Sequence, residues 1–236
     1  CMQWRGEAAT SRGVVERGFE IDASGRRVPG ALWTPEAGAD GRVVMLGHGG
    51  NADKRAPYLL TIARWLVRNH RISAFAIDGP GHGDRLGPGE KVDFESAWGA
   101  PETSDSIVED WQAALTAVRG EIGTGALGYW GLSMGTMMGV PVVAALAQEV
   151  RAALLGLMGF WGPNADRLRE DAAKVRCPVR FLVQWDDEIV PRDRCFELFD
   201  SLGTKDKVLH AHPGLHAHVP PAASRDSVRF LADALG

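Results

Sequence analysis

From residue 43 onward, short apolar runs of the kind found in buried strands alternate with amphipathic stretches of helical periodicity. Residues 43–46 are apolar at every position, which is typical of a strand covered on both faces in a parallel sheet. Residues 58–69 follow with apolar side chains at helical spacing, and Pro57 stands near the start of this stretch. Such alternation predicts a mostly parallel sheet with helices on both faces, which is a three-layer α/β fold.

The same alternation continues to the end of the chain. Further strands are predicted at residues 74–77, 126–130, 152–158, 179–185 and 207–210, and further helices at 107–118, 136–150, 192–202 and 225–235. Two earlier extended segments, 18–22 and 28–34, flank turn residues and predict an antiparallel pair. We therefore expect about eight strands in a single domain over residues 1–236, with residues 1–17 poorly ordered.

The overall composition and charge limit the classes of protein and partner that fit this chain. The chain is 45% hydrophobic and 24% charged, which is ordinary for a globular domain. Its net charge of −4 and the lack of any basic block argue against nucleic acid as a partner. Residues 1–12 lack the apolar core of a signal peptide and no apolar run reaches bilayer length, so we expect a cytoplasmic protein without a membrane partner. Cys1, Cys177 and Cys195 fit no zinc motif and are expected to be reduced thiols.

A serine stands at the junction between one predicted strand and the helix that follows it. Gly131, Ser133 and Gly135 form the pattern G-x-S-x-G there. In such a turn the serine backbone is strained and its hydroxyl is exposed above the sheet edge, while the glycines let neighbouring backbone pass close by. A serine hydroxyl becomes an effective nucleophile when a base takes its proton and an acid orients that base.

Candidates for the base and the acid follow in the chain. Asp186 and Asp187 come directly after the strand predicted at 179–185, and His216 and His218 come after the strand predicted at 207–210. Because the carboxyl ends of parallel strands meet at one edge of a sheet, we expect an aspartate and a histidine to lie close to Ser133. The order Ser, acid, His matches that of nucleophile-elbow hydrolases.

These motifs resemble the α/β-hydrolase family, and within it the small, capless group related to dienelactone hydrolases and bacterial carboxylesterases. Besides the elbow, residues 187–191 (DEIVP) are similar to the D-x-x-V-P motif of the family and residues 214–216 (GLH) to its late G-x-H. Residues 47–50 (GHGG) and 78–83 (DGPGHG) match two loops of the family. Dienelactone hydrolases proper use a cysteine nucleophile where this chain has Ser133.

The resemblance implies a serine hydrolase that cleaves small carboxylic esters through an acyl-enzyme and needs no cofactor. It assigns Ser133 as nucleophile and His216 as base, and it favours Asp187 over Asp186 as the acid. We expect Asp186 to be a surface or turn-capping carboxylate. Thioesters, lactones and amides react through the same intermediate, so they remain alternatives to an ester substrate. A catalytically silent binding protein with this fold is a further alternative.

The resemblance also implies where the oxyanion of the intermediate would lie. One donor would be the backbone N–H of Met134, directly after the nucleophile, and the other the N–H of Gly50, with Asn51 as the alternative. His48 and His82 are expected to organise their loops. Thr136 stands where many members of the family have glycine.

Residues around the predicted site give candidates for the substrate pocket. The irregular stretch 79–103 is the main candidate cover, since only residues 159–169 are available where a lid is usually inserted. Phe160 and Trp161 are candidate walls, and Asn51 and Arg85 are further candidate lining residues. Lys54, Arg55 and Arg85 either attract an anionic substrate or are solvated surface charges.

Three features suggest other chemistry or conflict with the pattern. Residues 47–52 (GHGGNA) formally match a dinucleotide fingerprint, with Asp78 as the acid, but the predicted helix begins too late and Asp78 lies too far along the chain. Four histidines between residues 210 and 218 could suggest a metal site, but neither a cysteine nor an HExxH motif accompanies them. Pro141 lies inside a predicted helix, where it should remove a hydrogen bond and bend the helix.

Overall fold

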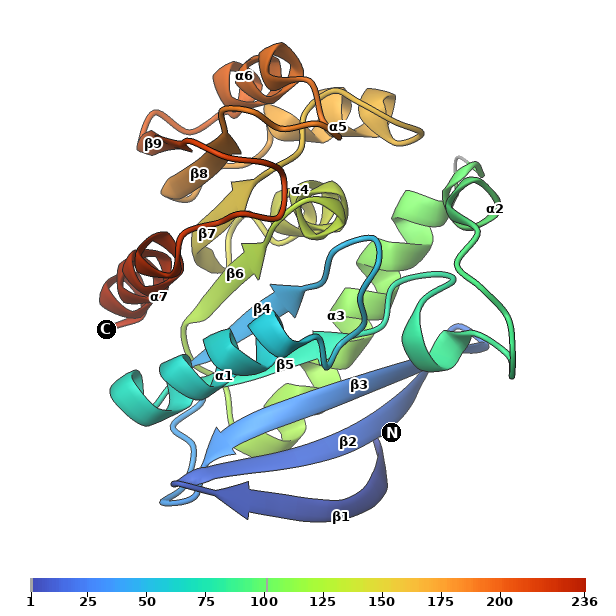
Figure 1. The fold of residues 1–236 in the computed structure, drawn as a ribbon. Coiled ribbons are helices and arrows are strands. Elements are labelled where there is room, and N and C mark those ends of the chain that lie inside the picture. The colour runs from blue at the N-terminus through green and yellow to red at the C-terminus, as the bar shows by residue number, and fades with distance from the viewer. Residues whose placement is uncertain (1, 101) are drawn as a thin grey trace.

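A computed structural model describes residues 2–100 and 102–236 of the chain. Its strands form one sheet in the order β1-β2-β3-β5-β4-β6-β7-β8-β9 (Figure 1). The strands are β1 (Gln3–Ser11), β2 (Val14–Ala23), β3 (Arg26–Pro35), β4 (Val43–Gly47), β5 (Ser73–Ile77), β6 (Leu127–Gly131), β7 (Val150–Gly156), β8 (Val179–Gln184) and β9 (Lys207–His212). The helices are α1 (Pro57–His70), α2 (Phe94–Trp98), α3 (Thr103–Ile122), α4 (Met134–Ala145), α5 (Ala165–Ala172), α6 (Arg192–Ser201) and α7 (Pro221–Leu235), with a 3₁₀ turn, η1 (Gly83–Arg85).

The pairing of the strands confirms the predicted α/β class. Strands β4 to β9 run parallel to one another, while β1, β2 and β3 pair antiparallel and β3 joins β5 antiparallel. The predicted antiparallel pair at 18–22 and 28–34 is β2 and β3. The parallel strands put all their carboxyl ends at one edge, where the predicted site residues follow β4, β6, β8 and β9.

Helices cover both faces of the sheet (Figure 1). On one face α1 and α7 pack side by side, and Leu59, Leu66 and Leu231 lie in a buried cluster with side chains of the sheet. The other face carries α3, α4, α5 and α6, with Trp111 and Met137 in a second buried cluster. These two apolar layers hold the sheet on both sides.

The prediction that residues 1–17 are poorly ordered was wrong for the described part of that segment. Strand β1 pairs antiparallel with β2, and the Arg17 guanidinium lies 4.3 Å from the ring centroid of Trp4. Most side chains of β1 are exposed, so the strand buries no apolar face that a sequence pattern could reveal. Its order comes from backbone hydrogen bonds to β2, and the sequence of β1 alone does not reveal this partner strand.

The segment between β7 and β8 does not form a cap. Its helix, α5, is eight residues long and packs against α4 and α6 within the helical layer. This agrees with the predicted minimal cap. None of the helices in residues 2–100 and 102–236 combines the length and apolar character required to cross a lipid bilayer.

Pro141 lies inside α4, and a side chain from outside the helix compensates for it. Proline has no N–H, so the carbonyl group of Met137, four residues earlier, loses its usual helical donor. The buried Asn164 side-chain amide donates to Met137 O at 3.3 Å, and Ser104 Oγ donates to Asn164 Oδ1 at 2.6 Å. The helix therefore tolerates Pro141 because Asn164 replaces the missing backbone donor.

This replacement gives a prediction for stability. Asn164→Ala should lower the free energy of unfolding by about 1–3 kcal/mol, because it leaves the buried Met137 carbonyl group without a donor. In a Pro141→Ala background the restored N–H can bond Met137 O, so the same substitution should cost about 1 kcal/mol less. Urea unfolding of the four proteins of this cycle measures the difference. Equal costs in the two backgrounds would show that Asn164 does not compensate for Pro141.

Candidate active site

The nucleophile candidate occupies a strained turn between β6 and α4. Ser133 has φ 58° and ψ −123°, a conformation that residues with a side chain rarely adopt. Its N–H donates to Gly156 O at the end of β7, at 2.9 Å. The predicted strand-to-helix elbow is therefore present, with the serine at its apex.

Close backbone packing explains the two glycines of the elbow. A Cβ atom on Gly131 would lie 2.5 Å from Gly135 O, and one on Gly135 would lie 2.5 Å from Gly47 O at the end of β4. Both distances are too short for any side chain, so only glycine fits at 131 and 135. The elbow is thus packed directly against the strand that leads into the predicted oxyanion loop.

Thr136 ties the elbow to the neighbouring strand. Its buried hydroxyl oxygen lies 2.9 Å from Gly131 O and 2.7 Å from Gly156 O, and it accepts the Gly156 N–H at 2.8 Å. A glycine at position 136 would lack this group. Threonine, in place of the glycine that many members of the family have here, therefore adds hydrogen bonds to the elbow.

The structure brings the three predicted side chains together. His216 Nε2 lies 2.9 Å from Ser133 Oγ, and His216 Nδ1 lies 2.7 Å from Asp187 Oδ2. The side chain of Asp187 is 2% exposed and that of His216 is 11% exposed, so the His–Asp contact is shielded from water. With a proton on Nδ1 held by Asp187, Nε2 can accept the proton of the serine hydroxyl.

Backbone groups fix the carboxylate of Asp187. Its Oδ1 accepts the N–H groups of Ile189 at 2.9 Å and Val190 at 2.8 Å, while Oδ2 faces His216. The tight turn that follows β8 therefore supplies both hydrogen bonds that orient the carboxylate. Asp187 rather than Asp186 contacts the imidazole, as the resemblance favours.

The two acidic neighbours of Asp187 hold the loop that carries His216. Asp186 Oδ2 accepts the Gly214 N–H at 3.0 Å, which agrees with its predicted turn-capping role. Glu188 Oε2 accepts the His216 N–H at 2.9 Å, and this backbone hydrogen bond lowers the pKa of Glu188. Sequence reasoning missed Glu188, because its role depends on the spatial pairing of two distant loops.

Three backbone N–H groups in the loops that follow β4 and β6 have no acceptor. Within residues 2–100 and 102–236, the N–H groups of Gly50, Asn51 and Met134 have no hydrogen-bond acceptor. Met134 is the first residue of α4, so its N–H also lies at the positive end of a helix dipole. These three groups are the predicted candidates for oxyanion donors.

His48 fixes the loop that carries two of these donors. Its Nε2 accepts the Gly79 N–H at 2.8 Å, so the proton of the neutral ring is on Nδ1, which lies 2.9 Å from Gly49 O. Burial lowers the pKa of His48 to about 4, which keeps the ring neutral. The predicted loop-organising role of His48 agrees with these contacts.

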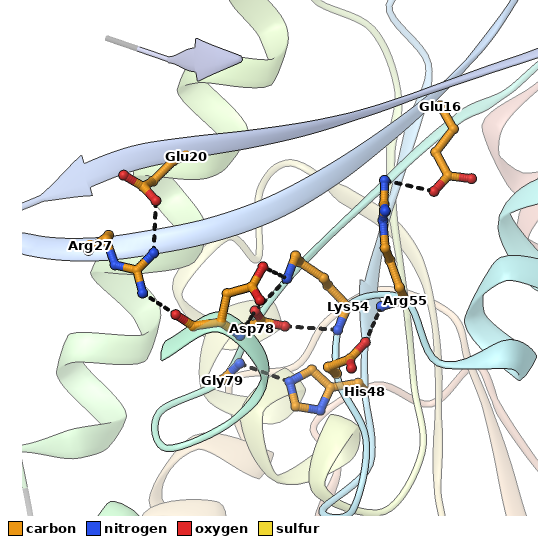
Figure 2. A network of polar contacts seen from close by, with 10 residues as sticks. Glu16, Glu20, Arg27, His48, Lys54, Arg55, Asp78 and Gly79 are labelled. Atoms are coloured by element: carbon orange, nitrogen blue, oxygen red, sulfur yellow. Dashed lines mark hydrogen bonds and ion pairs between the residues drawn. The ribbon is translucent and has the colours of Figure 1, made fainter. Parts of the chain in front are cut away.

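A buried ion-pair network joins the same loop to the one after β5 (Figure 2). Asp78 accepts both the backbone N–H of Lys54 at 2.9 Å and its ammonium group at 2.7 Å, and the ammonium also contacts Asp84 at 2.7 Å. Burial opposes the charged form of Lys54, but the two carboxylates outweigh it and raise its pKa. The network thus locks the two loops together below the site.

This network overturns two alternatives raised by the sequence. Asp78 is fully buried and bonded to Lys54 and to the Asp84 N–H, so it is not available to a ribose hydroxyl. The helix α1 begins only at Pro57, beyond the glycines, which also contradicts a dinucleotide site. The surface-charge reading of Lys54 was wrong as well, because its side chain is buried and paired.

The structure places the predicted pocket-lining and charged residues in different environments. Arg85 donates to the buried carboxylate of Asp110 at 2.6 Å, so its reading as a solvated charge was wrong, while its place in a pocket stays a prediction. Arg55 pairs with Glu16 at 3.0 Å (Figure 2). Phe160 lies mostly buried, with the Arg169 guanidinium 4.7 Å from its ring centroid, and as a pocket wall it stays a prediction.

Two predicted lining residues are exposed, and one aromatic residue was missed. Asn51 and Trp161 are both accessible to solvent, and as pocket residues they stay predictions. Phe94, at the start of α2, lies beside the oxyanion loop, since a Cβ atom on Gly50 would be 3.6 Å from its ring. Phe94 is an aromatic residue in the predicted cover 79–103, which is the signal that could have identified it.

The histidines near the C-terminus do not gather around a common point. Across the described ranges, no three His, Cys, Asp or Glu side chains are arranged to hold a metal ion. Cys177 and Cys195 are free and buried, and burial raises the pKa of each thiol to about 12. Cys1 lies outside the described residues.

Comparison with solved structures gives matches over the whole chain. A PEG-bound cold-adapted esterase from an Arctic intertidal metagenomic library is 43% identical, with a TM-score of 0.92 over 99% of this chain and 100% of that one. The native structure of such an esterase is 41% identical, with a TM-score of 0.86 over the same shares. The acetyl xylan esterase of Paenibacillus sp. R4 is 16% identical, with a TM-score of 0.78 over 100% of this chain and 89% of that one, and it shares the fold. Neither a family model nor a curated protein matches the chain.

The geometry predicts unequal effects for the two adjacent aspartates. Asp187→Asn should slow the reaction of Ser133 with a fluorophosphonate probe by about 10⁴-fold, because the amide favours the wrong imidazole tautomer. Asp186→Asn should slow it less than tenfold, because the amide oxygen can still accept the Gly214 N–H. Rates of labelling, followed by intact-protein mass, make the comparison. A larger loss for Asp186→Asn would mean that the wrong carboxylate has been assigned.

Proposed function

Because this chain belongs to the esterases of the α/β-hydrolase superfamily, we propose that it hydrolyses small carboxylic esters with Ser133, His216 and Asp187 as its catalytic residues. The observation that carries the proposal is the unbroken chain of contacts from Ser133 Oγ through both ring nitrogens of His216 to Asp187 Oδ2. Each distance is 2.9 Å or less, which is within reach for proton transfer. The esterase relatives that match the full chain support the same reaction.

The first half of the reaction acylates the enzyme. His216 Nε2 takes the hydroxyl proton as Ser133 Oγ bonds to the carbonyl carbon, and the electron pair of the C=O bond moves to oxygen. Asp187 stabilises the imidazolium that forms. The intermediate then collapses, the C–O bond to the alcohol breaks, and His216 returns its proton to the leaving alkoxide. An acyl group remains on Ser133.

The second half repeats these steps with water. His216 removes a proton from a water molecule as its oxygen attacks the acyl carbon. The second tetrahedral intermediate releases the carboxylic acid, and the proton on Nε2 returns to Ser133 Oγ. No redox step occurs, and the net reaction consumes one water and one ester.

Unpartnered backbone donors would stabilise the negative oxygen of both intermediates. The Met134 N–H and one N–H from Gly50 or Asn51 are the proposed pair, since each lacks an acceptor in the described residues and the loop of Gly50 and Asn51 follows Gly47, which packs against Gly135 of the elbow. Such donors act most strongly where they are fixed before the reaction begins. Removal of one donor of this kind typically costs about 10²–10³-fold in turnover.

The substrate we propose is an ester with a short or compact acyl group. Helix α5 forms part of the helical layer rather than a cap, and Phe94 lies close to the oxyanion loop. We propose that the site is an open cleft, which can bury only a few carbons, and each buried methylene contributes at most about 0.8 kcal/mol. We propose highest efficiency at about two to six acyl carbons and no interfacial activation.

One hydrolysis series tests the proposal. For p-nitrophenyl esters of increasing acyl length, kcat/KM of the wild-type protein should peak at about two to six carbons. Ser133→Ala should lose about 10⁴–10⁶-fold in turnover while its circular dichroism is unchanged, because backbone and glycines set the elbow. Matched thioesters, lactones and amides extend the series to the alternative bonds.

Two results would contradict this account. Turnover by Ser133→Ala within tenfold of wild type would remove the assigned nucleophile. A value of kcat/KM that keeps rising to long-chain lipid esters would show a deep acyl pocket instead of an open cleft.

A further inference from the structure

His82 connects the loop after β5 to the loop that carries the oxyanion donors. Its ring is fully buried, with Nε2 2.6 Å from Gly50 O and Nδ1 2.7 Å from Pro80 O. A carbonyl oxygen only accepts hydrogen bonds, so each ring nitrogen bonds its carbonyl group only when it carries a proton, and the bond to Gly50 O requires the proton on Nε2. Without that proton, a lone pair on nitrogen would face the oxygen of Gly50 at a repulsive distance.

The Gly50 carbonyl group belongs to the same peptide unit as the Asn51 N–H. A trans peptide is planar, and its C=O and N–H groups point in opposite directions. A bond that holds Gly50 O therefore also sets the direction of the Asn51 N–H. His48 acts in the same way one peptide earlier, because its contact with Gly49 O sets the direction of the Gly50 N–H.

Aromatic side chains of α2 shield this contact from water. The Phe94 ring meets the His82 ring edge-on, with centroids 6.5 Å apart, and stacks on Trp98 at 5.8 Å. On its other side His82 lies 5.2 Å from His48, measured between ring centroids. A hydrogen bond excluded from water is stronger than an exposed one, so this bond is well suited to hold a flexible glycine loop.

We propose that His82 is a positioning residue that holds the oxyanion donor of the Gly50–Asn51 peptide through an Nε2–H···O=C bond to Gly50. This inference rests on the proposed ester hydrolysis. His82 lies below the loop and touches the carbonyl oxygen rather than the substrate, so it acts through the peptide unit. Its loss should weaken binding of the transition state more than binding of the substrate.

Two amide variants of His82 separate the contact with Gly50 O from the contact with Pro80 O. The amide nitrogen of His82→Gln falls where Nε2 lies and can still donate to Gly50 O. The amide nitrogen of His82→Asn falls where Nδ1 lies and reaches only Pro80 O. Both variants are neutral and smaller than histidine, so they differ mainly in the contact under test. His70→Asn, at the end of α1, controls for the loss of a histidine elsewhere.

The proposal predicts a split between kcat and KM. On a short p-nitrophenyl ester, His82→Asn should lower kcat by about 10²-fold, the usual cost of a donor misplaced by an ångström, with KM within twofold. His82→Gln should stay within about threefold of wild type, and His70→Asn should match it. A trifluoromethyl ketone, which forms a hemiketal oxyanion on Ser133, should bind His82→Asn more weakly by the same factor as the loss in kcat.

Other outcomes overturn the proposal without affecting the proposed function. If His82→Asn and His82→Gln have equal kcat values while the wild-type protein hydrolyses esters through Ser133, the Gly50 contact does not position a donor. An increase in KM alone would indicate substrate binding and would also overturn it. If the wild-type protein does not hydrolyse these esters, the proposed function itself fails.

A measurement on the wild-type protein remains decisive even if the variants do not fold. In ¹⁵N spectra of protein labelled at histidine, the Nε2 of His82 should be protonated and should show coupling to the Gly50 carbonyl carbon across the hydrogen bond. His48 should show a proton on Nδ1 alone. A His82 ring protonated only at Nδ1 would leave no donor for Gly50 O and would overturn the proposal.

Discussion

The backbone of Ser133 lies at φ 58° and ψ −123°, and the arrangement of the site depends on keeping it there. Such a conformation costs about 1–3 kcal/mol and persists only where surrounding structure enforces it. Here the enforcement comes from Gly131, Gly135 and Gly47, whose backbones pack too closely for side chains, and from Thr136, which bonds to the ends of β6 and β7. Without these contacts the hydroxyl would not face His216.

The partners of the serine lie on loops, and each loop is held from outside the site. Asp186 and Glu188 accept backbone N–H groups of the loop that carries His216, on either side of the contact made by Asp187. On the opposite side, Lys54 and Asp78 join the oxyanion loop to the loop after β5 (Figure 2). Supporting contacts of this kind allow loops to hold groups with the precision that catalysis requires.

Local sequence patterns predicted the parts of the molecule that depend on local physics. An uninterrupted apolar run identified β4, because a strand buried on both faces has no polar positions, and the alternation of short extended runs with helical periodicity identified the other parallel strands. The elbow and the order of serine, acid and histidine predicted that an aspartate and a histidine would meet Ser133, because parallel strands end at one edge, and the resemblance to the family selected Asp187 and His216. The compensation of Pro141 by Asn164 has no local signature, since the two residues meet only after α4 and the loop before α5 pack together.

Contacts between distant segments account for the errors. Strand β1 was missed because it is ordered by pairing with β2 and not by an apolar face of its own. Arg85 reads as a free cation in the sequence, yet Asp110, on α3, neutralises it in the fold. Glu188 was missed because it holds the loop of His216 through a backbone contact between distant loops, which no spacing along the chain indicates.

The central claim is that Ser133 forms a covalent acyl-enzyme with help from His216. Mass spectrometry of protein quenched in acid during turnover of an activated ester tests this claim most directly. The account predicts a mass increase equal to the acyl group, located on the peptide that contains Ser133, and its absence in Ser133→Ala. A wild-type protein that hydrolyses the ester with no acyl group on Ser133 at any quench time would contradict the account.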